Sequence, residues 1–218
     1  MLPTLPPLSK KTRAMRRVFA AIYSTRAWGD GESASGPGST RERAASFLPD
    51  LVALVQSLGV RTLLDAPCGD FTWAEPLAAV VDRYVGIDVV PALIKANRRA
   101  SPHHHFLCRD MVHQRLPQAD LILCRDALVH LSCVDIFSTL VNFRRTGAAY
   151  LLATTFLGER SNEDIRTGDW RPLNMQRPPF SFPTPLALVD ERCHHTGGIY
   201  ADKRLALWRL ADLSPVGG

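Results

Sequence analysis

The chain has 218 residues, of which 46% are hydrophobic, so it can form one sizeable domain with little left for a second. Its apolar runs are well short of a membrane span, so no membrane association is expected. The five cysteines form no C-x-x-C pair and are odd in number. This usage is typical of reduced thiols and excludes a disulfide framework, so we expect a cytoplasmic protein.

The net charge of +5 is concentrated near the N-terminus. Residues 1–29 contain six Lys or Arg and no acidic residue, so 20 of the 26 basic residues are left to balance 21 acidic ones. An enzyme that acts on nucleic acid needs basic charge around its active face, and this distribution argues against such a partner. An acid-free start that contains arginines also fits an organellar transit peptide, which we keep as an alternative.

The first forty residues are expected to form a basic helix followed by a lid. The spacing of Met15, Val18, Phe19 and Ile22 predicts an amphipathic helix over Thr12–Tyr23. Residues 28–39 are rich in Gly and Ser and form either a linker or a lid over a ligand, to which Trp28 would offer an aromatic face. Ser39 opens a sequence that fits a helical capping box. We therefore divide the chain into this region, 1–40, and a main domain, 41–218.

The main domain begins with a strand, a tight turn and a helix. Thr62–Leu64 has the apolar, β-branched composition of a short buried strand, which Pro67 would end. Gly69 follows, and a helical pattern starts at Thr72, with Trp73, Leu77, Val80 and Val81 on its apolar face. Such a unit is typical of a nucleotide-binding α/β sheet, whose ligand lies beyond the carboxyl ends of the strands.

The chemistry of the turn indicates the class of ligand. A dinucleotide site needs G-x-G-x-x-G so that backbone amides can surround a pyrophosphate. This turn has one glycine, Gly69, and two carboxylates, Asp65 and Asp70. Carboxylates repel phosphate, but they suit a ligand that carries an ammonium and a sulfonium, such as S-adenosylmethionine.

Two further strands are expected to carry acidic residues. Tyr84–Val89 contains Asp88, about twenty residues beyond the glycine turn, where an acid binds ribose hydroxyls in a dinucleotide-type sheet. The alternative is that Asp88 caps the next helix, expected over Pro91–Arg99. His103–Asp110 is the third strand. Its three consecutive histidines alternate between faces, so we predict no metal site there.

The fourth strand is expected to lead into the reaction centre. Asp120–Arg125 is the fourth, and the switch point between the first and fourth strands would bring Asp126 and His130 beside the ligand. A structural role for His130 stays open. The fifth strand, 149–156, is followed by the long aperiodic segment 157–185, which we predict to be a substrate-side insertion; a homodimer contact through its aromatic residues is the alternative. The last strands, 186–192 and 203–210, are expected to form an antiparallel edge pair.

Four of these features, in this order and spacing, resemble class I S-adenosylmethionine-dependent methyltransferases. They are the turn Asp65-Ala-Pro-Cys-Gly69, Asp88, Asp110 with Met111, and Asp120-Leu-Ile-Leu-Cys124 with the following His130 and Leu131. The turn departs from the family motif, which has glycine at the positions of Pro67 and Phe71. The resemblance implies an α/β fold with a doubly wound, mostly parallel seven-stranded sheet and an antiparallel C-terminal hairpin. It also implies S-adenosylmethionine as cofactor and methyl donor, with Asp110 and Met111 contacting the adenine. The predicted cofactor-binding residues are Trp28, Ser39, Asp65, Pro67, Cys68, Gly69, Asp88, Asp110, Met111 and Arg125.

The expected activity is metal-independent O-methylation of a small molecule. A sulfonium is already activated, so direct displacement needs mainly alignment, and His130 is the candidate base if the acceptor must lose a proton. A carboxylic acid acceptor would instead need arginines, for which Arg125 and Arg171 are the candidates. The predicted substrate-binding residues are Asp126, Trp170, Arg171, Phe180 and Phe182. Two rival functions remain: an NAD- or nucleotide-dependent oxidoreductase on a similar sheet, and a methyltransferase-like binding module without turnover.

Overall fold

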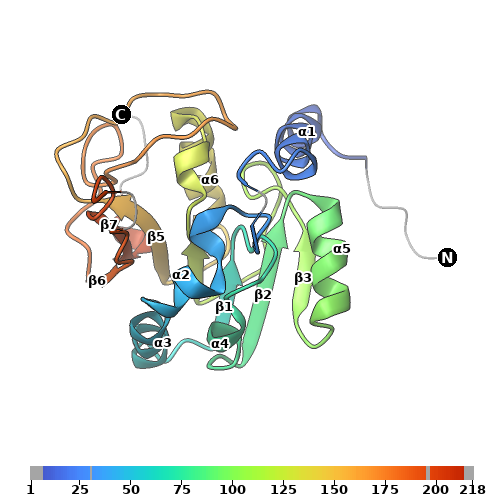
Figure 1. Ribbon diagram of the computed structural model, residues 1–218, viewed down its shortest axis with the longest axis horizontal. Helices are drawn as coiled ribbons and strands as arrows, with labels where there is room; N and C mark the ends of the chain where they lie inside the picture. The colour runs from blue at the N-terminus through green and yellow to red at the C-terminus, as the bar shows by residue number, and fades with distance from the viewer. Residues whose placement is uncertain (1–6, 30, 195–196, 214–218) are drawn as a thin grey trace.

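The computed structural model describes residues 7–29, 31–194 and 197–213, and within them the chain forms one seven-stranded sheet (Figure 1). The strand order is β3-β2-β1-β4-β5-β7-β6. The first five strands pair in parallel, and β7 runs antiparallel to both β5 and β6. The strands are β1 (Thr62–Asp65), β2 (Arg83–Asp88), β3 (His105–Cys108), β4 (Leu121–Cys124), β5 (Tyr150–Phe156), β6 (Ala187–Asp190) and β7 (Lys203–Arg209). The predicted fold class is confirmed.

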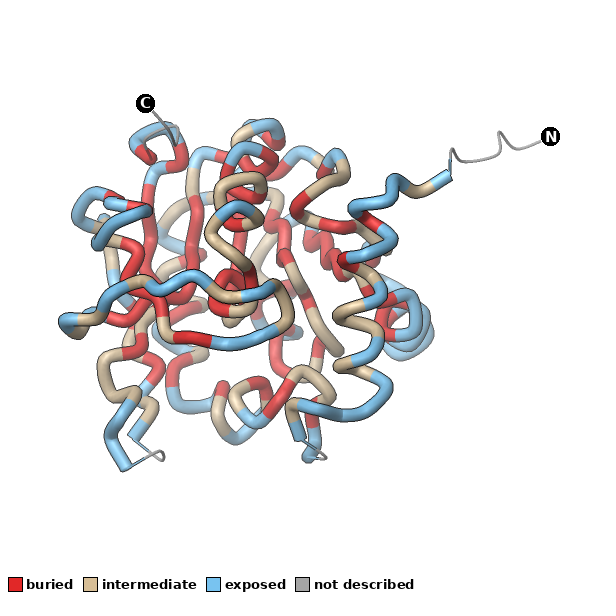
Figure 2. The backbone as a smooth tube through the Cα atoms, turned by 90° about the horizontal axis from the view of Figure 1, so that it is seen from above, coloured by how far each residue is buried: buried red, intermediate tan, exposed pale blue. Residues whose placement is uncertain are grey.

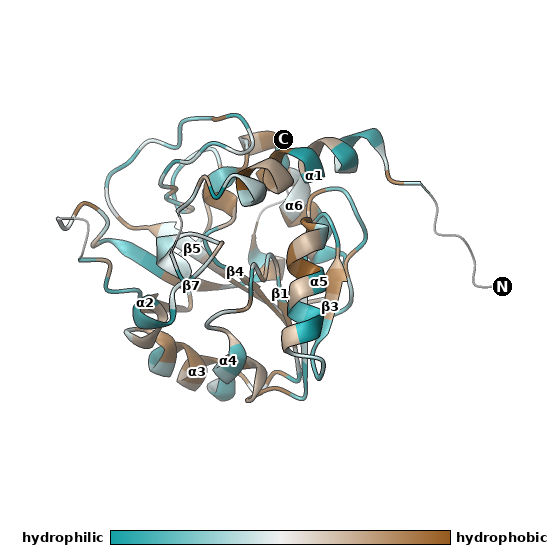
Figure 3. Ribbon diagram, turned by 45° about the vertical axis from the view of Figure 1, so that its right-hand side comes forward, coloured by the Kyte–Doolittle hydropathy of each residue, from teal (hydrophilic) through white to brown (hydrophobic). Residues whose placement is uncertain are grey.

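Helices cover both faces of the sheet, as a largely parallel sheet requires. They are α1 (Lys10–Ser24), α2 (Arg41–Ala45), α3 (Leu48–Ser57), α4 (Glu75–Ala78), α5 (Pro91–Ala100) and α6 (Cys133–Arg144). Figure 3 shows α6 on one side of the sheet and α3 and α4 on the other, with the hydrophobic strands between them. Three short 3₁₀ turns occupy Pro37–Ser39, Leu128–His130 and Leu210–Asp212.

The strands divide their buried side chains between two cores, one on each face. Because consecutive strand residues point to opposite faces, Leu63 joins the core under α3 and α4, whereas Leu64 joins the core under α6. Leu121 and Ile122 on β4 separate in the same way. Figure 2 shows that the buried residues concentrate in these central strands.

The structure corrects several predicted helix boundaries. The helix expected from Thr72 is confined to α4, a single turn over Glu75–Ala78. The N-cap of α2 is Thr40 and not Ser39, since Arg43 N donates to Thr40 Oγ1. The helix that the predicted capping box would open is divided into α2 and α3, and Pro49 lies in the first turn of α3, where its missing N–H is tolerated. Residues 1–6 of the predicted N-terminal region lie outside the described part of the chain.

Helix α1 lies at the end of the sheet where β2 and β3 terminate (Figure 1). Arg16 Nη2 donates to Cys108 Sγ at the end of β3, and Val18 packs against Gly168 in the segment that follows β5. The predicted apolar side of this helix therefore faces the carboxyl ends of the strands. No helix in the described ranges is long and apolar enough to cross a membrane.

Candidate active site

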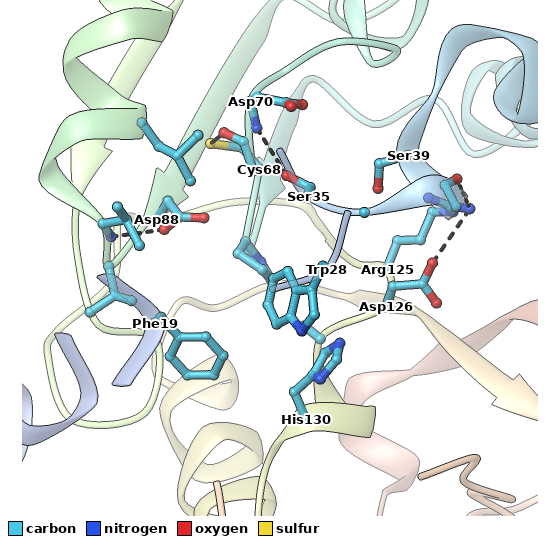
Figure 4. Close-up of a pocket in the computed structure, with 18 of the residues that line it drawn as sticks. Phe19, Trp28, Ser35, Ser39, Cys68, Asp70, Asp88, Arg125, Asp126 and His130 are labelled. Atoms are coloured by element: carbon cyan, nitrogen blue, oxygen red, sulfur yellow. Dashed lines mark hydrogen bonds and ion pairs between the residues drawn. The ribbon is translucent and has the colours of Figure 1, made fainter. Parts of the chain in front are cut away.

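A cavity of about 380 Å³ opens at the carboxyl ends of the parallel strands. Its walls come from the ends of β1, β2, β4 and β5, from α1, and from residues 34–39 (Figure 4). The antiparallel strand β7 contributes its first residue, Lys203, at the same edge. This is the edge at which an open α/β sheet binds its ligand.

The turn after β1 forms one wall of this cavity. Gly69 has a φ of +52°, a left-handed conformation that glycine adopts without strain. Phe71, with a φ of +57°, adopts the same left-handed conformation although it has a Cβ. Its ring packs against Tyr84, 5.0 Å away, and Phe106, 5.2 Å away, and this packing offsets a strain of roughly 1–2 kcal/mol. The turn thus keeps its shape although it departs from the family motif.

Residues 33–38 fold over this turn and are held at both ends. The Asp70 carboxylate accepts hydrogen bonds from Ser33 Oγ at 2.8 Å and from Ala34 N at 2.7 Å. At the other end, Arg125 Nη2 donates to Gly38 O at 2.9 Å. A Cβ at Gly69 would lie 2.3 Å from Ser35 Oγ, so the glycine is what lets this segment approach the turn. Hydrogen bonds thus hold residues 33–38 over the turn.

Three buried carboxylates line the cavity on the side of β1, β2 and β3. Burial raises the pKa of Asp65 to about 7, although the Tyr84 hydroxyl donates to its Oδ2 at 2.5 Å and partly opposes this rise. Burial likewise raises the pKa of Asp88 to about 6, with Val90 N donating to Oδ1 at 2.8 Å. Asp110 is fixed by Val112 N at 2.9 Å on Oδ1 and by His113 Nδ1 at 2.8 Å on Oδ2. Carboxylates in these positions suit a cationic or hydroxyl-rich ligand.

The opposite side of the cavity contains a network of two cations and two anions. Lys203 Nζ lies 2.7 Å from Asp126 Oδ2 and 3.1 Å from Glu191 Oε2. The guanidinium of Arg125 lies 2.5 Å from Glu191 Oε2 and 3.5 Å from Asp126 Oδ2. Burial opposes the charge on Asp126, but Lys203 and Arg125 outweigh it and hold the pKa of this carboxyl well below its usual range. Asp126 has a φ of +52°, a strained backbone held by Thr154 Oγ1 and typical of functional positions.

His130 lies between the two sides and has a defined tautomer. Its Nδ1 donates to Asp169 O at 2.9 Å, so in the neutral ring Nε2 is left as the acceptor. Trp28 stacks on the imidazole with ring centroids 4.5 Å apart, as Figure 4 shows. Burial lowers the pKa of His130, although Asp169 O and the nearby Asp126 partly oppose this shift. The ring therefore stays neutral at physiological pH and can accept a proton.

Thirteen of the sixteen residues predicted from sequence line this one cavity. They are Trp28, Ser39, Asp65, Pro67, Cys68, Gly69, Asp88, Asp110, Met111, Arg125, Asp126, His130 and Trp170. The structure does not bring Arg171, Phe180 and Phe182 to it, and this corrects the prediction. Arg171 donates to the carbonyl oxygens of Leu128, Val129 and Glu163, which fixes the segment before α6. Phe180 and Phe182 are buried in the core, where they contact Phe137 and Trp208.

Sequence reasoning missed several residues that line the cavity. Lys203, Tyr200 and Cys193 come from β7 and the connector before it, and Phe19 and Tyr23 come from α1. The apolar face predicted for α1 was a signal for Phe19, but it was taken as packing alone. Lys203 had no comparable signal, because only the antiparallel pairing of Phe156 with Lys203 brings it to this edge.

Known proteins resemble this chain in both sequence and fold. Residues 64–147 match a family model described as a methyltransferase domain. The chain is 26% identical to the malonyl-[acyl-carrier protein] O-methyltransferase of Serratia marcescens, with 71% of this chain covered. It spans 65% of the length of that relative, which is less than two thirds.

Two solved structures share the fold at low sequence identity. Magnesium protoporphyrin IX methyltransferase from Synechocystis PCC 6803, solved with bound S-adenosylhomocysteine, superposes with a TM-score of 0.52 at 15% identity, covering 68% of this chain and 74% of that one. The N-methyltransferase NodS from Bradyrhizobium japonicum, also solved with S-adenosylhomocysteine, gives a TM-score of 0.50 at 18% identity, covering 67% and 74%. Residues 64–147 thus match a methyltransferase domain, and the seven-stranded sheet is a fold that this chain shares with these two methyltransferase structures.

Proposed function

We propose that this protein transfers a methyl group from S-adenosylmethionine to an oxygen atom of a small molecule. The proposal rests on one observation. Asp65, Asp88 and Asp110 line the same cavity, beside a turn that contains a single glycine. The turn lacks the further glycines whose backbone amides would surround a pyrophosphate, which disfavours an NAD-dependent oxidoreductase. When bound, S-adenosylmethionine supplies an activated methyl group on a positively charged sulfur.

The carboxylates divide the recognition of such a cofactor between them. Asp88 Oδ1 already accepts from Val90 N, and its second oxygen is the proposed acceptor for the ribose hydroxyls. Asp65, at the end of β1, offers negative charge to the ammonium of the amino-acid part. Asp110 and Met111 are the proposed contacts of the adenine. These roles fit the donor and acceptor groups of the cofactor with no metal ion.

His130 is the proposed base for an acceptor that must lose a proton. The Nδ1–H is held by Asp169 O, so a hydroxyl proton would be received at Nε2. The lowered pKa of His130 keeps that nitrogen unprotonated at neutral pH. This arrangement supports hydroxyl acceptors, such as phenols, over acceptors that are already ionised.

A carboxylic acid acceptor is the second candidate. It is favoured by the name of the malonyl-[acyl-carrier protein] O-methyltransferase relative, because a malonyl group carries a carboxylate. The arginines predicted for such an acceptor are engaged elsewhere, Arg125 by Glu191 and Arg171 by backbone carbonyls. Lys203, which lines the same side of the cavity as Arg125, is likewise paired, with Asp126 and Glu191. A carboxylate is already ionised, so methylation of an acid would not need His130.

Transfer of a labelled methyl group from S-adenosylmethionine to panels of phenols and carboxylic acids tests the proposal. The variants are His130→Ala and His130→Asn, whose amide can still donate to Asp169 O. We expect phenol methylation to fall by about 10²–10⁴-fold in both variants, with unchanged affinity for S-adenosylhomocysteine. Methylation of acids alone, unaffected by either variant, would support the second candidate. Lack of transfer to any acceptor would contradict both.

A further inference from the structure

Three aromatic side chains form a cluster at the β5–β7 side of the cavity. Phe156 ends β5, Trp170 lies in the segment after it, and Tyr200 lies in the connector before β7. The ring centroids are 6.4 Å apart for Phe156 and Trp170, 5.8 Å for Phe156 and Tyr200, and 5.2 Å for Trp170 and Tyr200. All three pairs meet edge to face, which is a favourable geometry for aromatic rings. Three separate segments of the chain thus converge on one aromatic wall.

An ion pair holds this wall in place. The Asp202 carboxylate accepts from Gly158 N at 2.8 Å and from Arg160 Nη2 at 3.0 Å. The same guanidinium lies over the rings of Phe156 at 5.6 Å and Tyr200 at 6.0 Å. These contacts tie the start of the long segment to the connector before β7. The rings are therefore fixed before any ligand binds, which lowers the entropic cost of binding.

The wall lies on the far side of the cavity from the proposed cofactor residues. Phe156 pairs in register with Lys203, which contacts Asp126, so the wall adjoins the charged network. Asp88 is on β2, and β1 and β4 separate that strand from β5. With neighbouring strands about 4.8 Å apart, the two sides are roughly 14 Å apart. A nucleoside bound at Asp88 therefore does not occupy the aromatic wall, which stays accessible to the second substrate.

The exposure of Trp170 shows that the wall is not simply core packing. Phe156 is 1% exposed, whereas Trp170 is 44% exposed although its ring lines the cavity. An aromatic surface at a cavity mouth is suited to a flat apolar ligand, which would cover the indole and displace water from it. Resting on the function proposed above, we propose that the methyl acceptor is an aromatic hydroxyl compound whose ring packs against Trp170 and Tyr200.

A matched pair of probe molecules tests this inference. Naphthol and its fully saturated counterpart decahydronaphthol share one carbon skeleton, but only naphthol has an aromatic ring. Each is titrated calorimetrically into the full-length protein saturated with S-adenosylhomocysteine, so that binding is measured apart from reactivity. Wild type is compared with Trp170→Ala, Tyr200→Leu and the control Leu188→Ala, an exposed residue on β6 outside the cavity.

We expect naphthol to bind wild type and Leu188→Ala about tenfold more tightly than decahydronaphthol. This preference should fall below about twofold in Trp170→Ala and Tyr200→Leu, while both retain S-adenosylhomocysteine binding. Equal binding of the two probes by wild type, or a preference that survives both substitutions, would overturn the inference. The inference would also be overturned if wild type were a dimer that Trp170→Ala dissociates while its affinity for naphthol stays unchanged. The indole would then serve a dimer contact and not the acceptor. If S-adenosylhomocysteine itself fails to bind wild type, the proposed function is what fails.

Discussion

Lys203 Nζ lies 2.7 Å from Asp126 Oδ2, and this ion pair joins the start of β7 to the turn after β4. The two residues are 77 positions apart in the chain. Glu191 and Arg125 complete the network, in which the side chains of Lys203 and Glu191 are 10% and 1% exposed. Its charges balance, so the cavity has a polar side that is fixed without attracting phosphate or carboxylate strongly.

Replacing Lys203 by Met should destabilise the protein by about 3–5 kcal/mol, because Arg125 alone would then balance the carboxylates of Asp126 and Glu191. Urea denaturation measures this change. Adding Glu191→Gln should recover part of the loss, since it removes the surplus negative charge and leaves Arg125 paired with Asp126. Arg61→Ala is the control, because it breaks the solvent-exposed pair with Asp82. A loss in Lys203→Met no larger than in that control would contradict the account of the network.

Gly69→Ala should weaken both stability and cofactor affinity. Its Cβ would collide with Ser35 Oγ and displace residues 33–38 from the turn. Gly147→Ala is a matched control, since Gly147 also has a positive φ, +77°, but has nothing within 4 Å of an added Cβ. The control should lose about 1 kcal/mol from backbone strain and keep its affinity for S-adenosylhomocysteine. Equal losses of stability and affinity in the two variants would show that the close approach of Ser35 to Gly69 does not matter.

The affinity for S-adenosylhomocysteine should rise as the pH increases through about 7, where Asp65 ionises. Tyr84→Phe removes a hydrogen bond that lowers the pKa of Asp65, so it should move this midpoint to higher pH. Calorimetry from about pH 5 to about pH 9 covers the range. An unmoved midpoint would assign the transition to another group.

Stability should follow the opposite trend with pH. The folded protein holds the proton on Asp65 more tightly than the unfolded chain, whose carboxyl has a pKa near 3.8. Its contribution to stability is therefore fully present below that value and is lost as the pH rises through about 7. Asp65→Asn should flatten this decline in urea denaturation across the same range. If the free energy of unfolding fell with pH by the same amount in wild type and Asp65→Asn, a raised pKa of the buried Asp65 carboxyl would be contradicted.

The rate of methyl transfer to a phenol should depend on the protonation of His130. Burial lowers the pKa of this imidazole from its ordinary value of 6.5. The midpoint of the acid limb in the plot of kcat against pH should therefore lie below 6.5. Steady-state rates across the acidic range test this, with His130→Asn as the variant that should lose the limb. An unchanged acid limb in His130→Asn would place the titrating group elsewhere.

Local patterns predicted the parts of the site that follow each parallel strand. Asp65, Gly69, Asp88 and Asp126 each lie near the carboxyl end of a strand that composition alone identifies, and parallel pairing brings those ends together. The same reasoning predicted the antiparallel pairing of the last two strands, since 186–192 and 203–210 have no helix between them, whereas the seven-stranded sheet was implied by the family resemblance.

The remaining parts depend on contacts that no local pattern encodes. The segment 157–185 has no period to separate inward from outward side chains, so Phe182 was assigned to the substrate wall although it packs on Trp208 in the core. Arg171 was assigned by charge, but its donors are taken by backbone carbonyls. Lys203 comes to the cavity only through its pairing opposite Phe156.

Calorimetric titration of wild type and Asp88→Ala with S-adenosylhomocysteine measures whether the buried carboxylates bind a sulfur nucleoside. Asp82→Ala is the control, because Asp82 is exposed beside the opposite end of β2. We predict binding to wild type and Asp82→Ala, and a loss of about 1–3 kcal/mol in Asp88→Ala. Unchanged binding in Asp88→Ala, or wild-type binding of NAD in place of S-adenosylhomocysteine, would contradict the account.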